Sequence, residues 1–297
     1  MSELLENFKH TRVKTSGAEI VVSTAGNGPP LLLMHGNPFT HVTWHKIAPR
    51  LAEEFTLVLP DLRGYGDSSK PDGGADHSAY SFRSMALDQI ELMRHLGFEK
   101  FFAGGHDRGA RVLHRLCLDH PEAVTKAAFI DMLPQHHLLN NVTRKWGMFS
   151  WHWFFMVQPN PTPERMISAD PEFFIRRKLS KTDQGTSFFD PRALAEYIRC
   201  IKDPKTVYGM CEDYRATFGV DLDMDTADFE AGRKVTCPSM ILWGDKGGVG
   251  RNHDAAAIWS RYATRIERTA TVPSGHYLQE ECPEETSREL RGFFASA

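Results

Sequence analysis

A short segment framed by glycines, Gly105-His106-Asp107-Arg108-Gly109, places a carboxylate between an apolar run and a helical pattern. The order small-x-nucleophile-x-small is typical of a nucleophile elbow, which holds its central side chain exposed on a strained backbone. Glycines at both ends allow the strand and the helix to approach closely. A carboxylate there attacks an electrophilic carbon and forms an ester, which suits alkyl halides or epoxides better than peptides. Asp107 is therefore the candidate nucleophile.

The candidate base is a histidine near the C-terminus. His276 lies in Pro273-Ser274-Gly275-His276-Tyr277, which follows the apolar run at residues 267–272. If that run is a strand, the loop after it carries His276 to the carboxyl end of the sheet, where an elbow also lies. Histidine titrates near neutrality and can activate the water that hydrolyses an ester.

Two acids compete for the role of orienting His276. Many elbow enzymes have an acid in a Trp-Gly-x-x-Asp arrangement, but Trp243-Gly244-Asp245-Lys246-Gly247 has glycine at the expected position. Asp131 ends the apolar run at residues 127–131 and would face the same end of the sheet. We prefer Asp131 to Asp245 as the group that stabilises the imidazolium.

The loop His35-Gly36-Asn37-Pro38-Phe39 follows the apolar run at residues 30–34. In an elbow enzyme this loop supplies one backbone donor of the oxyanion hole, and the residue after the nucleophile supplies the other. We predict that the amides of Phe39 and Arg108 fill these positions.

Two arginines follow the nucleophile, at a spacing that puts both on one helix face. Arg108 and Arg111 would lie in the first helical turn, where the macrodipole disfavours cations. Violations of a local rule tend to occur at functional sites. Two guanidinium groups beside Asp107 could bind a substrate carboxylate.

Aromatic residues with hydrogen-bond donors are abundant between residues 134 and 232. They include His152 and Trp153 in Trp151-His-Trp-Phe-Phe155 and, later, Tyr208 and Tyr214. A leaving halide needs donors in a desolvated pocket, and these rings supply them. Such aromatics also commonly fill a core.

Apolar runs and helical patterns alternate along most of the chain. The predicted strands cover residues 19–23, 30–34, 56–60, 100–103, 127–131, 239–243 and 267–272. The predicted helices cover residues 84–96, 108–118, 191–201 and 284–294. This alternation predicts a mostly parallel sheet flanked by helices on both faces. The rhythm breaks in the middle, so we predict a core of residues 1–133 and 233–297 with a helical cap inserted at 134–232.

The composition excludes several classes of protein. A formal charge of -3 gives no global attraction for nucleic acid or an anionic membrane, so attraction for an anionic substrate must be local. Five cysteines without a CxxC pair indicate reduced thiols. The acidic N-terminus does not have the pattern of a signal peptide. Both observations lead us to expect a cytoplasmic protein. No H-E-x-x-H motif or phosphate-binding loop occurs, and we expect neither metal nor cofactor.

These residues resemble the α/β-hydrolase superfamily and, within it, the haloacetate dehalogenases, over essentially the whole chain. The motifs that carry the resemblance are His35-Gly-Asn-Pro-Phe39, His106-Asp-Arg-Gly-Ala-Arg111, Asp131, His152-Trp153, Tyr214 and Gly275-His276. The run Asp-Arg-x-x-Arg joined to His-Trp is much more specific than the superfamily motifs.

The resemblance implies an α/β-hydrolase fold with an inserted helical cap and hydrolysis of a haloacetate to glycolate and halide. It implies that Asp107 attacks C2, that His276 activates water and that Asp131 is the partner of His276. Arg108 and Arg111 would hold the carboxylate of a small anionic substrate, and His152, Trp153 and Tyr214 would surround the halide. It also implies a homodimer.

Two other functions remain open. An epoxide hydrolase needs the same nucleophile, base and acid but uses cap tyrosines to protonate the opening oxygen, and Tyr208 and Tyr214 keep this alternative open. Haloalkane dehalogenases and epoxide hydrolases commonly have Trp after the nucleophile, and Arg108 in that position favours a charged substrate. The non-enzymatic alternative is a binding protein that has kept the fold and a small-molecule pocket.

Overall fold

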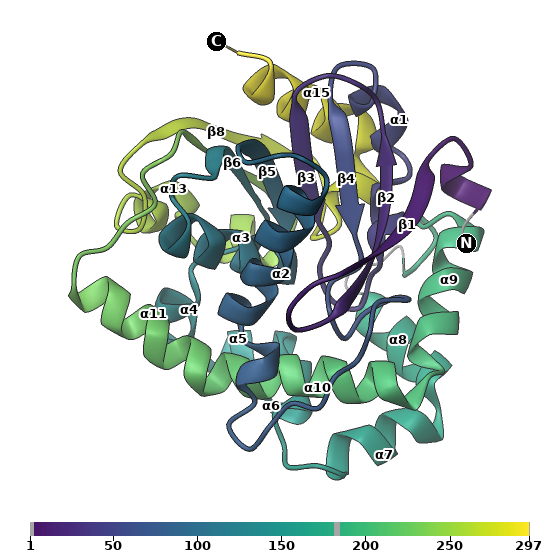
Figure 1. Cartoon of the computed structure of the whole chain (residues 1–297). Coiled ribbons are helices and arrows are strands. Elements are labelled where there is room, and N and C mark those ends of the chain that lie inside the picture. The colour runs from purple at the N-terminus through teal and green to yellow at the C-terminus, as the bar shows by residue number, and fades with distance from the viewer. Residues whose placement is uncertain (1–2, 181–184, 297) are drawn as a thin grey trace.

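The computed structural model describes residues 3–180 and 185–296. An eight-stranded sheet forms its centre, in the order β1-β2-β4-β3-β5-β6-β7-β8 (Figure 1). Strands β3 to β8 run parallel, whereas β2 is antiparallel to both of its neighbours. The strands are β1 (Lys9–Lys14), β2 (Glu19–Ala25), β3 (Pro30–Met34), β4 (Thr56–Pro60), β5 (Phe101–His106), β6 (Val124–Ile130), β7 (Ser239–Gly244) and β8 (Ile266–Val272). The predicted α/β fold with a mostly parallel sheet is confirmed.

Helices cover both faces of this sheet, and the side chains of β3 show how the two cores form. Leu31 and Leu33 join an apolar cluster with α1 (Ala48–Leu51) and α15 (Pro283–Phe294). Leu32 and Met34 point the other way and join a cluster with α2 (Phe82–His95) and α3 (Arg108–Asp119). A strand buried on both faces reads as a continuous apolar run, which is why β3 was predictable.

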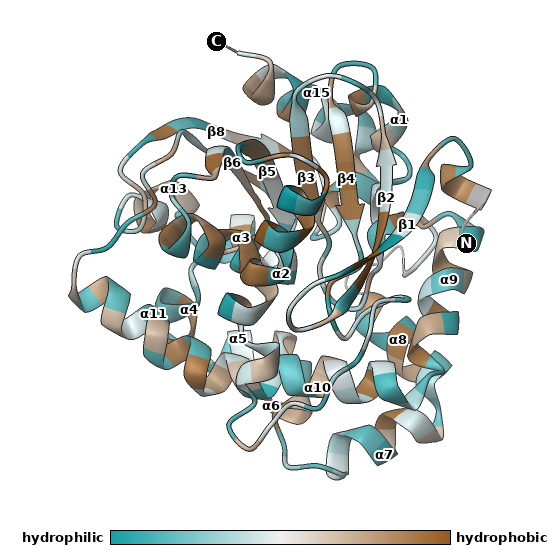
Figure 2. Cartoon of the chain, in the orientation of Figure 1, coloured by the Kyte–Doolittle hydropathy of each residue, from teal (hydrophilic) through white to brown (hydrophobic). Residues whose placement is uncertain are grey.

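The remaining core elements are short helices. They are the 3-10 helices η1 (Glu3–Leu5), η2 (His41–Trp44) and η3 (Ser78–Tyr80), and the α-helices α12 (Gly248–Asn252), α13 (Ala255–Trp259) and α14 (Leu278–Glu281). Strand β1 was not predicted, because Val13 is the only strongly apolar residue in its sequence Lys-His-Thr-Arg-Val-Lys. It lies at the edge of the sheet and is mostly hydrophilic (Figure 2).

In the described part of the chain, eight helices lie between β6 and β7 and gather at one end of the sheet (Figure 1). Within residues 134–180 and 185–232 the structure contains no strand. The helices are α4 (Gln135–Asn140), α5 (Arg144–Phe149), α6 (Trp151–Met156), α7 (Thr162–Ala169), α8 (Pro171–Leu179), α9 (Pro191–Ile201), α10 (Pro204–Phe218) and α11 (Val220–Glu230). This is the helical insertion that was expected; its treatment as a cap bounded at 134 and 232 stays a prediction.

Candidate active site

Asp107 lies in the sharp turn between β5 and α3, with φ 50° and ψ -113°. The two glycines around it have no room for a side chain. A Cβ on Gly105 would lie 2.4 Å from the Gly109 carbonyl oxygen, and a Cβ on Gly109 would lie 2.3 Å from the Met34 carbonyl oxygen. The backbone therefore has the elbow geometry that the sequence predicts, with the Asp107 carboxylate at the N-terminus of α3, where the helix dipole favours a negative charge.

His276 lies between two carboxylates. Its Nδ1 atom is 2.5 Å from Oδ2 of Asp131, and its Nε2 atom is 3.9 Å from Oδ1 of Asp107. The other Asp131 oxygen accepts a hydrogen bond from the Gly244 amide at 3.1 Å, which fixes the carboxylate. Asp245 is exposed, and within the described residues no ion pair joins it to His276. The structure thus brings together the acid, base and nucleophile that we preferred.

A second histidine, which the sequence analysis did not assign, holds the His276 loop. Nε2 of His106 is 2.7 Å from the His276 carbonyl oxygen, and a carbonyl can only accept, so Nε2 carries the proton. Burial lowers the pKa of His106 to about 4, so the ring is neutral at physiological pH. Its Nδ1 atom is then the acceptor that faces the Gln279 amide, 3.4 Å away.

The backbone donor on the nucleophile is not the one that we predicted. The Phe39 amide donates to the Gly36 carbonyl at 2.9 Å and closes a turn, so it cannot serve an oxyanion. The Asn37 amide instead donates to Oδ2 of Asp107 at 3.1 Å. The Arg108 amide begins α3 and is one of the N-terminal groups that no helical carbonyl accepts. Asn37 therefore replaces Phe39 as the loop donor beside this amide.

Arg108 is fully buried, and it is not among the described residues that line the cavity next to Asp107. Its guanidinium donates to both carboxylate oxygens of Asp213, at 3.0 Å through Nε and also through Nη2, and it contacts Thr217. Burial opposes the charge, but the Asp213 carboxylate outweighs it and raises the pKa of Arg108. This corrects the prediction that Arg108 binds the substrate carboxylate. Its charge is already balanced by the Asp213 carboxylate of α10.

Asp213 also connects this ion pair to the loop that bears the backbone donor. The Tyr65 hydroxyl donates to Oδ2 of Asp213 at 2.5 Å and accepts a hydrogen bond from the Asn37 side chain at 3.1 Å. The chain Asn37-Tyr65-Asp213-Arg108 thus joins the oxyanion loop, the insertion and the elbow helix. Nothing in the sequence pattern indicates it, since its members are separated by 28 to 148 residues.

Arg111 lines the cavity together with Asp107. Its Nη1 donates to the Leu133 carbonyl at 3.1 Å, and its guanidinium carbon lies 4.9 Å from the Trp153 ring centre. Its Nε is buried, and among the described residues it has no hydrogen-bond partner. Burial, together with repulsion from Arg108, lowers the pKa of Arg111 to about 10. Arg111 is therefore a charged donor that the described protein groups do not neutralise.

The predicted halide donors lie at different depths. His152 and Trp153 line the cavity, whereas Tyr214 is 1% exposed and lies behind them, with its ring 6.0 Å from His152 and 5.5 Å from Trp153. Tyr208 does not line the cavity, and its hydroxyl accepts a hydrogen bond from the Gly73 amide at 2.9 Å. One of the two tyrosines considered for epoxide opening is thus directed elsewhere.

The cavity has a volume of about 570 Å³, and its wall is strongly cationic. Its two acidic side chains are Asp107 and Asp131, while its five cationic side chains are Arg111, Lys145, Lys178, Lys246 and Arg251. The wall thus carries a formal charge of +3 in a chain whose total is -3. Lys178, 4% exposed, donates to the Asn37 carbonyl at 3.0 Å. The local attraction for an anion that the sequence analysis required is present.

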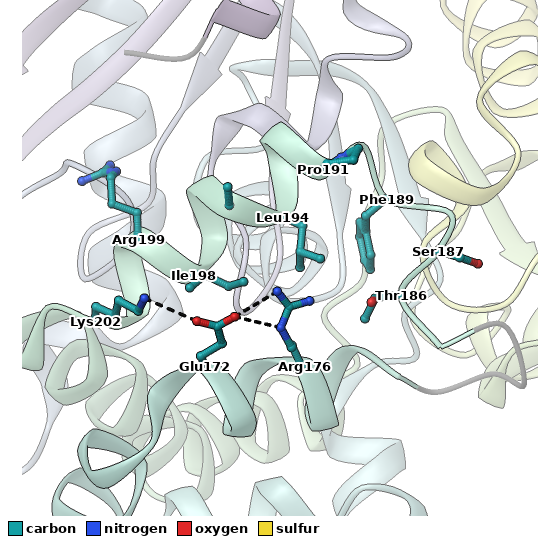
Figure 3. A pocket seen from close by; sticks show the side chains of 11 residues that line it. Glu172, Arg176, Thr186, Ser187, Phe189, Pro191, Leu194, Ile198, Arg199 and Lys202 are labelled. Atoms are coloured by element: carbon teal, nitrogen blue, oxygen red, sulfur yellow. Dashed lines mark hydrogen bonds and ion pairs between the residues drawn. The ribbon is translucent and has the colours of Figure 1, made fainter.

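A second hollow, of about 630 Å³, lies between α8 and α9 (Figure 3). Glu172 there is paired with Arg176 and Lys202. None of the candidate catalytic residues lines it.

The described residues hold no cluster of ligands suited to a metal ion. None of their helices is long and apolar enough to cross a membrane.

Comparisons with known proteins identify the family to which this fold belongs. Residues 29–283 match the model of the alpha/beta hydrolase fold family. The chain is 41% identical to a fluoroacetate dehalogenase from Burkholderia sp over 99% of its length and 96% of the relative. It is 32% identical to a soluble epoxide hydrolase from Corynebacterium sp. (strain C12), covering 96% and 97% of the two chains.

Solved structures show the same likeness. A candidate alpha/beta hydrolase from Nostoc sp PCC 7120 superimposes with a TM-score of 0.95 and 47% identity, over 98% of this chain and 99% of the other. The family match and these identities lead to one conclusion. The chain belongs to the alpha/beta hydrolase family.

Proposed function

We propose that this hydrolase removes halide from small 2-halocarboxylates such as fluoroacetate or chloroacetate. The observation that carries the proposal is the pairing of a carboxylate nucleophile with Arg111 in one cationic cavity. A monoanionic substrate can place its carboxylate on Arg111 and its C2 atom on Asp107. A neutral epoxide would leave the Arg111 charge buried without a partner, which is costly.

In the first step Oδ1 of Asp107 attacks C2, the carbon-halogen bond breaks with its electron pair, and halide leaves. His152 and Trp153 line the wall of the same cavity, where their N-H groups can stabilise the departing anion. Tyr214, behind these rings, completes the aromatic enclosure. This step needs no base, because no proton moves.

In the second step Nε2 of His276 accepts a proton from water, and the hydroxide attacks the carboxyl carbon of the Asp107 ester. Asp131 stabilises the imidazolium that forms, since it contacts Nδ1 at 2.5 Å. The negative charge that develops on Oδ2 is met by the Asn37 amide, already 3.1 Å away. The bond between the acyl carbon and the substrate oxygen then breaks, His276 gives its proton to the leaving alkoxide, and the 2-hydroxyacid leaves while the new Asp107 carboxyl group loses its proton to solvent.

Halide release from fluoro-, chloro- and bromoacetate tests the activity, and a single turnover in ¹⁸O-labelled water tests the route. The label is expected in the Asp107 side chain, while the first product carries an unlabelled enzyme oxygen. Label that enters the product directly would exclude the ester. Hydrolysis of epoxides without any halide release would favour the second candidate, an epoxide hydrolase, which rests on the relative that bears that name.

A further inference from the structure

Two short helices form the sides of the outer part of the cavity. Neither α5, from the insertion, nor α12, from the core, has a buried residue, yet both contribute to the cavity wall. Lys145 on α5 donates to Oδ1 of Asn252 on α12 at 2.7 Å. A Cβ on Gly248 would lie 3.3 Å from the Phe149 ring, so the two helices also contact each other there. This part of the cavity is its opening to solvent.

Three exposed cations, Lys145, Lys246 and Arg251, line this opening. Among the described residues none of them forms an ion pair with a carboxylate. Exposed arginines elsewhere do form such pairs: Arg83 with Asp119 and Arg199 with Asp67.

The acids nearest in sequence to these cations do not balance them. Asp245 and Asp254 do not line the cavity. The Asp254 carboxylate accepts a hydrogen bond from the Ala257 amide at 3.0 Å, as the N-cap of α13. The opening therefore keeps its positive charge.

We propose that Lys145, Lys246 and Arg251 form an entrance subsite for small carboxylates. A cleft lined by one sign of charge concentrates the opposite ion and speeds its capture. The subsite would collect the substrate anion at the opening and deliver it to the more deeply buried Arg111. The inference rests on the proposed function, because it requires an anionic substrate, and it adds three residues that act on substrate entry rather than on the chemical step.

Charge reversal tests the subsite. Arg251→Glu and Lys246→Glu are compared with Lys100→Glu, an exposed lysine before the amino end of β5, which makes the same change in charge far from the carboxyl ends of the strands. Lys145 is kept, since its reversal would also break the bond to Asn252. Each reversal at the opening should lower kcat/KM for chloroacetate about two- to fivefold at low ionic strength, and the loss should vanish near about 0.5 M salt. Chloroacetamide, which is uncharged, should be unaffected.

Fluorescence quenching gives a readout that does not need turnover. Trp146 lines the opening. The emission of Trp146 is obtained as the difference between each protein and the same protein with Trp146→Phe. Iodide should quench this emission less strongly in the Arg251→Glu variant than in the wild type. Neutral acrylamide should quench it equally in both. Equal responses to iodide, or equal losses with chloroacetate and chloroacetamide, would overturn the entrance subsite. A wild-type protein that releases no halide would overturn the proposed function instead, and the iodide result would still decide the subsite.

Discussion

Replacing Arg111 with methionine should make the protein more stable and less able to use a carboxylate substrate. Burial, together with repulsion from Arg108, lowers the pKa of Arg111 from its ordinary value to about 10. A folded pKa below the unfolded one means that the charged form destabilises the fold at every pH below about 10. The shift corresponds to about 3 kcal/mol. Methionine also removes the hydrogen bond to Leu133 and the stacking on Trp153, together worth about 1 to 2 kcal/mol. The net gain in the free energy of unfolding is therefore about 1 to 2 kcal/mol.

Denaturant unfolding at pH 7 measures the stability, and steady-state kinetics with two substrates measure the specificity. A charge-assisted contact is worth roughly 1.5 to 3 kcal/mol, so Arg111→Met should lower kcat/KM for chloroacetate about 10- to 100-fold. Chloroacetamide has no carboxylate and should lose much less. A variant that is clearly less stable than wild type, and that loses equally on both substrates, would refute the reasoning and make Arg111 a structural residue.

Three further predictions concern catalysis, the halide and the core. The variant His276→Ala should release about one halide per site and keep an alkylated Asp107, because only hydrolysis needs the base; mass spectrometry that finds folded protein without adduct would reject this division of roles. The variant Trp153→Phe should raise the free-energy barrier to fluoride release in a single turnover by about 1 to 3 kcal/mol, and the barrier to bromide release by less, since fluoride needs the stronger donors; equal losses would show that the Trp153 ring only shapes the cavity. Burial lowers the pKa of His114 to about 4, so its share of stability is present above about pH 6.5 and is lost as the pH falls towards 4. Between pH 7 and 5 the wild type should therefore lose about 2 kcal/mol more than His114→Leu, as measured in parallel urea titrations, and identical losses would contradict the shift.

The meeting of the three candidate catalytic residues was predictable because each follows a strand, and parallel strands end at one edge of the sheet. Asp107, Asp131 and His276 needed only this rule and the glycines of the elbow. The strands β3, β4 and β7 were predicted almost to the residue, since strands buried on both faces read as apolar runs.

Contacts between distant segments could not be derived in this way. The ion pair of Arg108 with Asp213 joins the elbow helix to a helix about a hundred residues later, and no local pattern marks either partner. Phe39 was chosen by its place in the loop, but a turn to Gly36 occupies its amide and moves the donor to Asn37. Lys178 reaches the same loop from α8 through its Nζ, and only the tertiary fold reveals that contact.

The hydrogen bonds that link Asn37, Tyr65, Asp213 and Arg108 restrict how new substrate preferences can arise by recombination. An insertion taken from another hydrolase would cover the site only if it also brought an acid to position 213. Without that acid, a fully buried guanidinium would lose its counter-charge, at a cost of about 3 to 5 kcal/mol, and Tyr65 would lose the acceptor of its proton. Exchange of a whole insertion therefore preserves the fold only if the new insertion also carries an acid at position 213. Single substitutions among the wall residues, such as Trp146 and Phe149, leave these hydrogen bonds intact and can therefore change the substrate preference.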